Sequence, residues 1–131
     1  MKIIGLLGGM SWESSIVYET IINEEVRRRL GGAHSADLLI RSYDFALLEQ
    51  LQSSGEWEQA GQLLADGARR LEAVGAEMLL LCTNTMHTVA DVITDAVGVP
   101  FLHIADPTAA AIKAAELNRA VAGDENGGCD G

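Results

Sequence analysis

A cysteine followed by three small polar residues is the most chemically informative segment of the sequence. Cys82 ends an apolar run and is followed by Thr83, Asn84 and Thr85, where a helix is predicted to begin. Backbone N–H groups at a helix start favour negative charge, so this position predicts a thiol with a lowered pKa. The same N–H groups, with the three polar side chains as donors, make a pocket for a small carboxylate. A nucleophile or base and an anion site are therefore predicted together. The alternative is a structural cysteine at a strand end, with Thr83 or Thr85 as the helix cap.

A glycine turn near the N-terminus is the second candidate for anion binding. Gly8, Gly9, Met10 and Ser11 follow a short apolar run and lead into a predicted helix. Backbone N–H groups in such a turn are able to hold a negative charge. The turn matches neither the GxGxxG pattern nor GxxxxGK followed by Ser or Thr, so the sequence predicts no nucleotide cofactor. A strand-to-helix turn capped by Ser11 explains the same residues without a ligand.

The histidines and carboxylates predict no metal site. His34, His87 and His103 do not have the spacing of metal ligands. His87 falls about one turn into the helix after Cys82, where it either tunes the thiol or serves in capping or packing. His103 either lines the cleft or is a solvated loop residue. No pair of carboxylates has a spacing typical of acid–base catalysis.

Alternating strands and helices are predicted to position these residues. Four apolar runs bounded by turn residues predict strands, and amphipathic segments between them predict helices. The strands are predicted at Ile3–Leu7, Leu38–Ser42, Met78–Leu81 and Phe101–His103, and the helices at Trp12–Leu30, Phe45–Gln52, Trp57–Val74, Met86–Val97 and Thr108–Leu117. The pattern indicates an α/β three-layer sandwich with a mostly parallel four-stranded sheet, because parallel neighbours need crossover helices. Ligands of such sheets bind beyond the carboxyl ends of the strands, where Cys82 and the glycine turn fall.

Composition and charge exclude several classes of partner. The chain of 131 residues has the size of one domain and carries a formal net charge of −10. This charge predicts no binding to nucleic acid or to a membrane surface, and no apolar run is long enough to span a bilayer. Two cysteines are too few for a disulfide scaffold, so both are interpreted as free thiols of a cytoplasmic protein.

Two motifs give the sequence a specific resemblance to the aspartate/glutamate racemase family. The motifs are IGLLGGMSWES, which begins at Ile4, and CTNTMH, which begins at Cys82, and the likeness covers about residues 1–115. The resemblance implies one of the two similar α/β domains of the racemase fold and an amino-acid substrate, without pyridoxal phosphate, metal or nucleotide as cofactor. It implies that one cysteine removes the α-proton as a thiolate while a second thiol on the opposite face returns a proton. The residues that it implies for the site are Cys82 as catalytic thiol and Met10, Gln52, Thr83, Asn84 and Thr85 as substrate contacts.

The C-terminal segment departs from the family. The likeness ends at about Ala115, and residues 116–131 predict a divergent, disordered tail. Family members continue into a second domain with the other catalytic cysteine in a Gly-Cys-Thr motif, whereas Cys129 follows no strand and precedes Asp130. We therefore expect the N-terminal domain of an aspartate or glutamate racemase, catalytically incomplete in this chain. The alternatives are a non-catalytic amino-acid-binding domain and a half-enzyme restored by pairing, as a homodimer or with a separate C-terminal half.

Overall fold

The protein forms an α/β domain in the computed structural model, which describes residues 1–82, 89–102, 108–109 and 113. The elements in chain order are β1 (Ile4–Gly8), α1 (Trp12–Leu30), β2 (Leu38–Ser42), α2 (Phe45–Ser53), α3 (Trp57–Ala73), β3 (Met78–Leu81), α4 (Ala90–Ala96) and β4 (Phe101–Leu102). The bounds from β1 to β3 lie within one residue of the predicted ones. The predicted start of the fourth helix, the end of the last strand, most of the final helix and the tail lie outside the described residues. Within the described part, no helix combines the length and hydrophobicity that crossing a bilayer requires.

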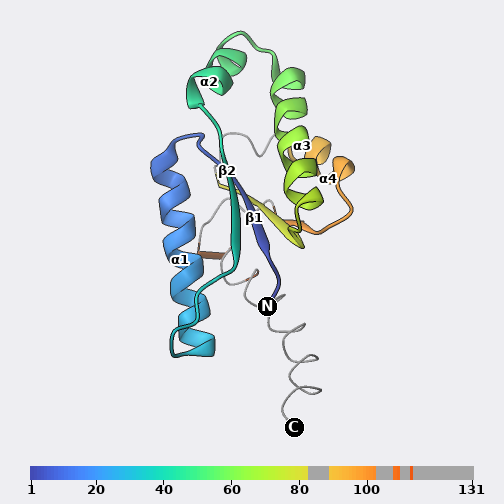
Figure 1. The fold of residues 1–131 in the computed structure, drawn as a ribbon. Helices are drawn as coiled ribbons and strands as arrows, with labels where there is room; N and C mark the ends of the chain where they lie inside the picture. The colour runs from blue at the N-terminus through green and yellow to red at the C-terminus, as the bar shows by residue number, and fades with distance from the viewer. Residues whose placement is uncertain (83–88, 103–107, 110–112, 114–131) are drawn as a thin grey trace.

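The four strands form one parallel sheet in the order β2-β1-β3-β4 (Figure 1). Leu6 of β1 lies opposite Ile40 of β2 on one side and opposite Leu80 of β3 on the other. Since all pairs are parallel, the carboxyl ends of the strands meet at one edge of the sheet, the edge at which α1 and α2 begin. The predicted sheet is confirmed.

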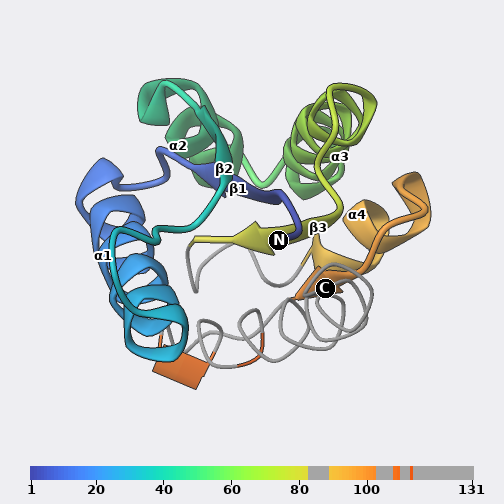
Figure 2. The ribbon, with the colours of Figure 1, turned by 60° about the horizontal axis from the view of Figure 1, so that its bottom comes forward.

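Helices cover both faces of this sheet (Figure 2). Alternate residues of β1 and β3 point to opposite faces, and all of them are buried because both faces are covered. Tyr18 and Ile22 of α1 pack on one face with Ile4, Leu6, Met78 and Leu80. The opposite face packs against residues of α2, α3 and α4; this second cluster includes Leu7, Leu48, Leu64, Leu79, Leu81 and Ile93. These two apolar clusters confirm the predicted three layers.

A glycine closes the C-terminal end of α1, whereas the cap expected from Ser11 at its start is absent. Gly31 ends α1 with a φ of 71°, and its N–H donates to the Arg27 carbonyl at 2.7 Å. Ser11 does not cap α1 with its side chain; its hydroxyl donates to a carboxylate oxygen of Glu13 at 2.9 Å. The predicted cap is wrong because Ser11 has a φ of 81°, outside the extended conformation from which a capping hydroxyl reaches the first turn. Asp44 does cap α2 through its Oδ1.

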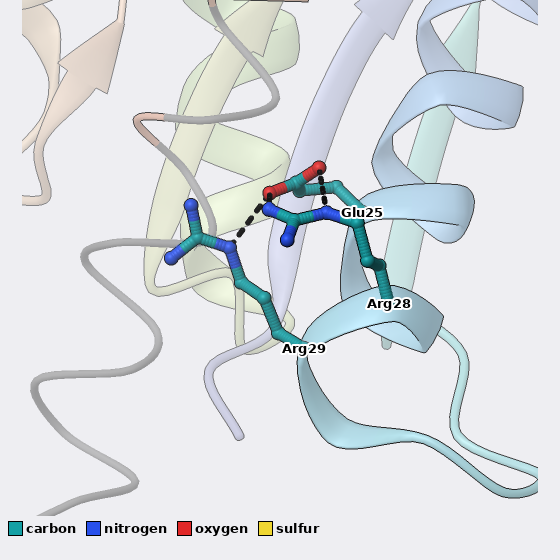
Figure 3. Close-up of polar contacts among 3 residues, drawn as sticks. All are labelled: Glu25, Arg28 and Arg29. Carbon is teal, nitrogen blue, oxygen red and sulfur yellow. Dashed lines mark hydrogen bonds and ion pairs between the residues drawn. The ribbon is translucent and has the colours of Figure 1, made fainter.

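An ion-paired group closes the last turns of α1 (Figure 3). The Glu25 carboxylate accepts hydrogen bonds from Arg28 Nε at 3.2 Å and from Arg29 Nε at 2.7 Å, and pairs with a terminal nitrogen of Arg28. These bonds lower the pKa of Glu25 to about 2, and the bonds from Arg28 make the largest contribution. The group joins residues of a single helix end, so it stabilises α1 locally rather than linking layers.

Candidate active site

The parallel sheet brings Cys82 and the glycine turn to the same edge, as predicted. Cys82 follows the last residue of β3, and its N–H donates to the Leu7 carbonyl of β1 at 2.9 Å. On the other side of β1, the N–H of Tyr43 donates to the Gly8 carbonyl at 3.0 Å. The end of β1 is therefore held between the residues that follow β2 and β3, and the glycine turn leaves the sheet between them.

The backbone of the glycine turn is more specialised than the sequence indicates. Gly9 has a φ of +88°, and a Cβ there would lie 2.3 Å from both the N and the O of Tyr43, so only glycine fits. The Gly9 N–H donates to the Ser15 hydroxyl at 2.9 Å and is occupied. The N–H groups of Met10 and Ser11 have no hydrogen-bond partner among the described residues. The donors left for a ligand at this turn are therefore Met10 and Ser11, not the glycines.

Ser11 carries backbone strain at this edge. It is the one non-glycine residue with a positive φ in the part of the chain that the structure describes. Such a conformation costs about 1–3 kcal/mol and is found chiefly at ligand and active sites. The Ser11 carbonyl accepts from Ser14 N at 3.1 Å, and its hydroxyl donates to Glu13, so local bonds maintain it. Sequence reasoning missed this feature because serine is a common cap and gives no sign of a strained backbone.

The Cys82 thiol is fully buried, and its pKa is raised rather than lowered. Its side chain belongs to the apolar cluster under α1, with Leu80 and Tyr18 among its members. Burial raises the pKa of Cys82 to about 12, and the Glu19 carboxylate adds to the effect. The expectation of a lowered pKa is therefore wrong for the described residues, since a thiolate in apolar surroundings lacks a counter-charge. The N–H groups on which that expectation relied, after residue 82, lie outside the described residues.

Of the other predicted site residues, the structure describes Met10 and Gln52. Met10 is buried in the apolar cluster that contains Tyr43 and Leu48, on the face opposite the Cys82 side chain. Gln52 lies in the last turn of α2 and is partly buried. Met10 and Cys82 thus share an edge but not an apolar cluster. Thr83, Asn84, Thr85, His87, His103 and Cys129 lie outside the described residues.

A groove runs along α1. This groove has a volume of about 460 Å³ and is lined by Ile16, Glu19, Thr20, Asn23, Glu24, Arg27, His34 and Ser35. None of the predicted site residues lines it. No three His, Cys, Asp or Glu residues of the described chain gather as metal ligands would.

The fold and the position of the thiol define the class of protein. A parallel sheet with helices on both faces, and with its chemically distinctive residues at the carboxyl edge, is an α/β domain of the kind that binds small ligands at that edge. Residues 7–122 match the model of the Asp/Glu/Hydantoin racemase family. The chain belongs to this family, and the resemblance seen in its two motifs is confirmed.

Solved structures of similar proteins support this assignment. A Yersinia pestis protein assigned as an Asp/Glu racemase is 54% identical, with a TM-score of 0.79; the match covers 88% of this chain and 50% of that one. An aspartate racemase homologue from Pyrococcus horikoshii OT3 is 32% identical, with a TM-score of 0.71, over 78% of this chain and 44% of that one. The chain spans about half the length of these relatives.

Proposed function

We propose that this domain contributes one catalytic thiol, Cys82, to a cofactor-independent racemase that inverts aspartate or glutamate at Cα. The observation that carries the proposal is the shared edge: Cys82 follows β3 directly beside the end of β1. At that end the Met10 and Ser11 amides have no partner among the described residues. A substrate carboxylate bound by those amides is held at the edge where Cys82 ends its strand. Membership of the racemase family supports this assignment.

Inversion at Cα needs an acid and a base on opposite faces of the substrate. A thiolate takes the α-proton, the electron pair of the C–H bond passes to Cα and its carboxylate, and a thiol on the other face delivers a proton to Cα. Because racemisation runs in both directions, each sulfur is the base in one direction and the acid in the other. The raised pKa keeps Cys82 protonated at neutral pH, which suits the donor role. The base role needs a positive charge beside the sulfur, and the substrate ammonium group supplies one.

Polar groups around the substrate hold its negative charge in this proposal. We assign substrate contacts to the Met10 amide, Gln52, Thr83, Asn84 and Thr85. Hydrogen-bond donors directed at a developing anion contribute about 2.7–4 kcal/mol each when they are preorganised in a site without water. Such donors take the place of a metal or pyridoxal phosphate in stabilising the carbanion.

The second thiol is proposed to come from a partner, either a second copy in a homodimer or a separate C-terminal half. Exposed aromatic side chains at the starts of three helices support docking of such a partner. Trp12, Phe45 and Trp57 are the first residues of α1, α2 and α3, and they are 60%, 38% and 40% exposed. Exposed large apolar side chains are typical of a surface that another protein covers when they form one patch.

The test measures exchange of the α-hydrogen and inversion of the configuration at Cα separately. The purified chain is incubated with L-aspartate or L-glutamate in deuterium oxide; proton NMR follows α-hydrogen exchange, and chiral chromatography follows the D-enantiomer. We expect slow exchange of the α-hydrogen with retention of configuration. Cys82→Ala should abolish this exchange, and the matched control Cys129→Ala should leave it unchanged. Exchange that persists in Cys82→Ala would exclude Cys82 as the catalytic thiol. Rapid formation of D-enantiomer in Cys129→Ala would show that a homodimer supplies a second Cys82, and size-exclusion mass would identify the dimer.

The burial of the thiol favours a second candidate function, an amino-acid-binding domain without catalysis. A fully buried thiol with a pKa of about 12 is unreactive at neutral pH. In that case the same incubation gives no α-hydrogen exchange, while L-aspartate still shifts the Met10 and Ser11 amide resonances. Exchange that depends on Cys82 would exclude this candidate.

A further inference from the structure

We propose that Tyr43 is a positioning residue that fixes the Gly8–Gly9–Met10 turn against α3. The inference rests on the proposed role of that turn in binding the substrate carboxylate. It concerns how the unpaired Met10 and Ser11 amides are held in place, and it adds Tyr43 and Gly67 to the residues on which the site depends.

The side chain of Tyr43 connects the edge of the sheet to α3. Tyr43 follows β2, is buried, and donates its hydroxyl to the Leu63 carbonyl of α3 at 3.1 Å. In an α-helix the carbonyl of residue 63 is directed at residue 67, which is glycine. A Cβ on Gly67 would lie 1.8 Å from the Tyr43 hydroxyl oxygen and 3.0 Å from Cζ. Helix α3 therefore has a glycine where the hydroxyl reaches its backbone.

The main chain of Tyr43 contacts the turn at the same time. Its N–H donates to the Gly8 carbonyl at 3.0 Å, and the Gly9 backbone lies so close to Tyr43 that no side chain fits between them. The Arg41 guanidinium lies 4.2 Å from the centre of the Tyr43 ring. Burial raises the pKa of Tyr43, so the hydroxyl remains a donor through the neutral range. Tyr43 thus contacts both α3 and the turn whose amides are proposed to bind the substrate, so a shift of α3 would move the turn.

Glycine-to-alanine substitutions in α3 give a matched pair for testing this. Gly67→Ala places a methyl group on the Tyr43 hydroxyl, whereas Gly61→Ala meets nothing closer than the 3.5 Å contacts with Val89 and Val92. Tyr43→Phe removes the hydroxyl and keeps the ring. The double variant Tyr43→Phe/Gly67→Ala removes the oxygen with which the new methyl group overlaps. Circular dichroism is used first to choose a temperature at which each variant is folded.

The main readout is the dissociation constant for L-aspartate, measured by titration of the Met10 and Ser11 amide resonances. We expect Gly67→Ala to weaken binding by about tenfold, as overpacking displaces the turn, and Tyr43→Phe by about fivefold, the factor for one hydrogen bond of ordinary net strength. Gly61→Ala should bind as the parent does, and the double variant should recover to the level of Tyr43→Phe. A purely structural role would lower the melting temperature without changing the affinity of the folded protein. Equal affinities of Gly67→Ala and Gly61→Ala would overturn the proposal, as would a double variant no better than Gly67→Ala.

A second readout requires no ligand and separates this inference from the proposed function. The Gly9 amide, which donates to Ser15, is followed by hydrogen exchange relative to the Leu80 amide in the centre of the sheet. Selective acceleration at Gly9 in Tyr43→Phe and Gly67→Ala, but not in Gly61→Ala, supports positioning even if the parent does not bind L-aspartate. Unchanged relative exchange in Gly67→Ala would overturn positioning even if the parent binds L-aspartate.

Discussion

Cys82 should be alkylated far more slowly in the folded protein than in the unfolded chain. Burial raises its pKa from the ordinary value of 9.0 to about 12. At pH 7 the thiolate fraction is then about 10⁻⁵ instead of about 10⁻², a thousandfold difference that corresponds to about 4 kcal/mol. Only the thiolate reacts with iodoacetamide, so the rate at Cys82 should fall by at least this thousandfold factor, because burial also shields the sulfur from the reagent.

The assay is pulse alkylation across pH, followed by quenching and peptide mapping, with the urea-unfolded chain as reference. A matched pair of variants tests the electrostatic part of the shift. Glu19→Gln removes the carboxylate that raises the pKa of Cys82 and should move the midpoint to lower pH. Glu24→Gln makes the same chemical change on α1 at a residue that does not contribute to the shift, and it should leave the midpoint in place.

Protein stability provides an independent measure of the same pKa. Because the folded-state pKa lies above the unfolded one, the contribution of Cys82 to stability is complete below pH 9.0 and is lost as the pH rises to about 12. The free energy of unfolding should therefore decline less steeply over this range in Cys82→Ala than in the parent protein. An alkylation midpoint near the ordinary value of 9.0 in the folded protein would refute the reasoning, because it would show that burial does not hold the thiol neutral.

Three further predictions concern the elements that support the site. Glu25→Gln should make the loss of stability in acid less steep. The pKa of Glu25 is lowered from 4.5 to about 2, so its contribution to stability is present above pH 4.5 and is lost as the pH falls through about 2. Identical acid-unfolding curves of the variant and the parent would contradict this. Asp44→Ala should cost about 1 kcal/mol in urea unfolding by removing the cap on α2, whereas Asp44→Asn keeps an acceptor and should cost less; equal losses in the two variants would contradict the cap. Leu80→Ala removes a fully buried side chain from the centre of the sheet and should cost about 2–5 kcal/mol in the same assay; a loss below about 1 kcal/mol would show that the site is not tightly packed.

The sequence alone determined the order of the elements and the edge at which Cys82 and the glycine turn lie. A continuous apolar run such as Met78–Leu81 marks a buried strand, and a glycine such as Gly31 marks the end of a helix. Both signals depend on residues close together in the chain, so they can be recognised in a single sequence. Parallel pairing then follows from the crossover helices and brings the ends of β1 and β3 together. The two motifs around the glycine turn and Cys82 were sufficient to indicate the racemase family.

Only the tertiary structure decided the properties that depend on neighbours distant in the chain. The pKa of Cys82 rises because α1 and the adjacent strands bury the thiol, which no local pattern at residues 82–87 reveals. The cap expected at Ser11 is replaced by a strained backbone and a bond to Glu13. The contact between Tyr43 and α3 requires Gly67, which is 24 residues further along the chain. Sequence periodicity specifies which side chains are buried, but solvation, strain and hydrogen bonding are set by the groups that folding places around them.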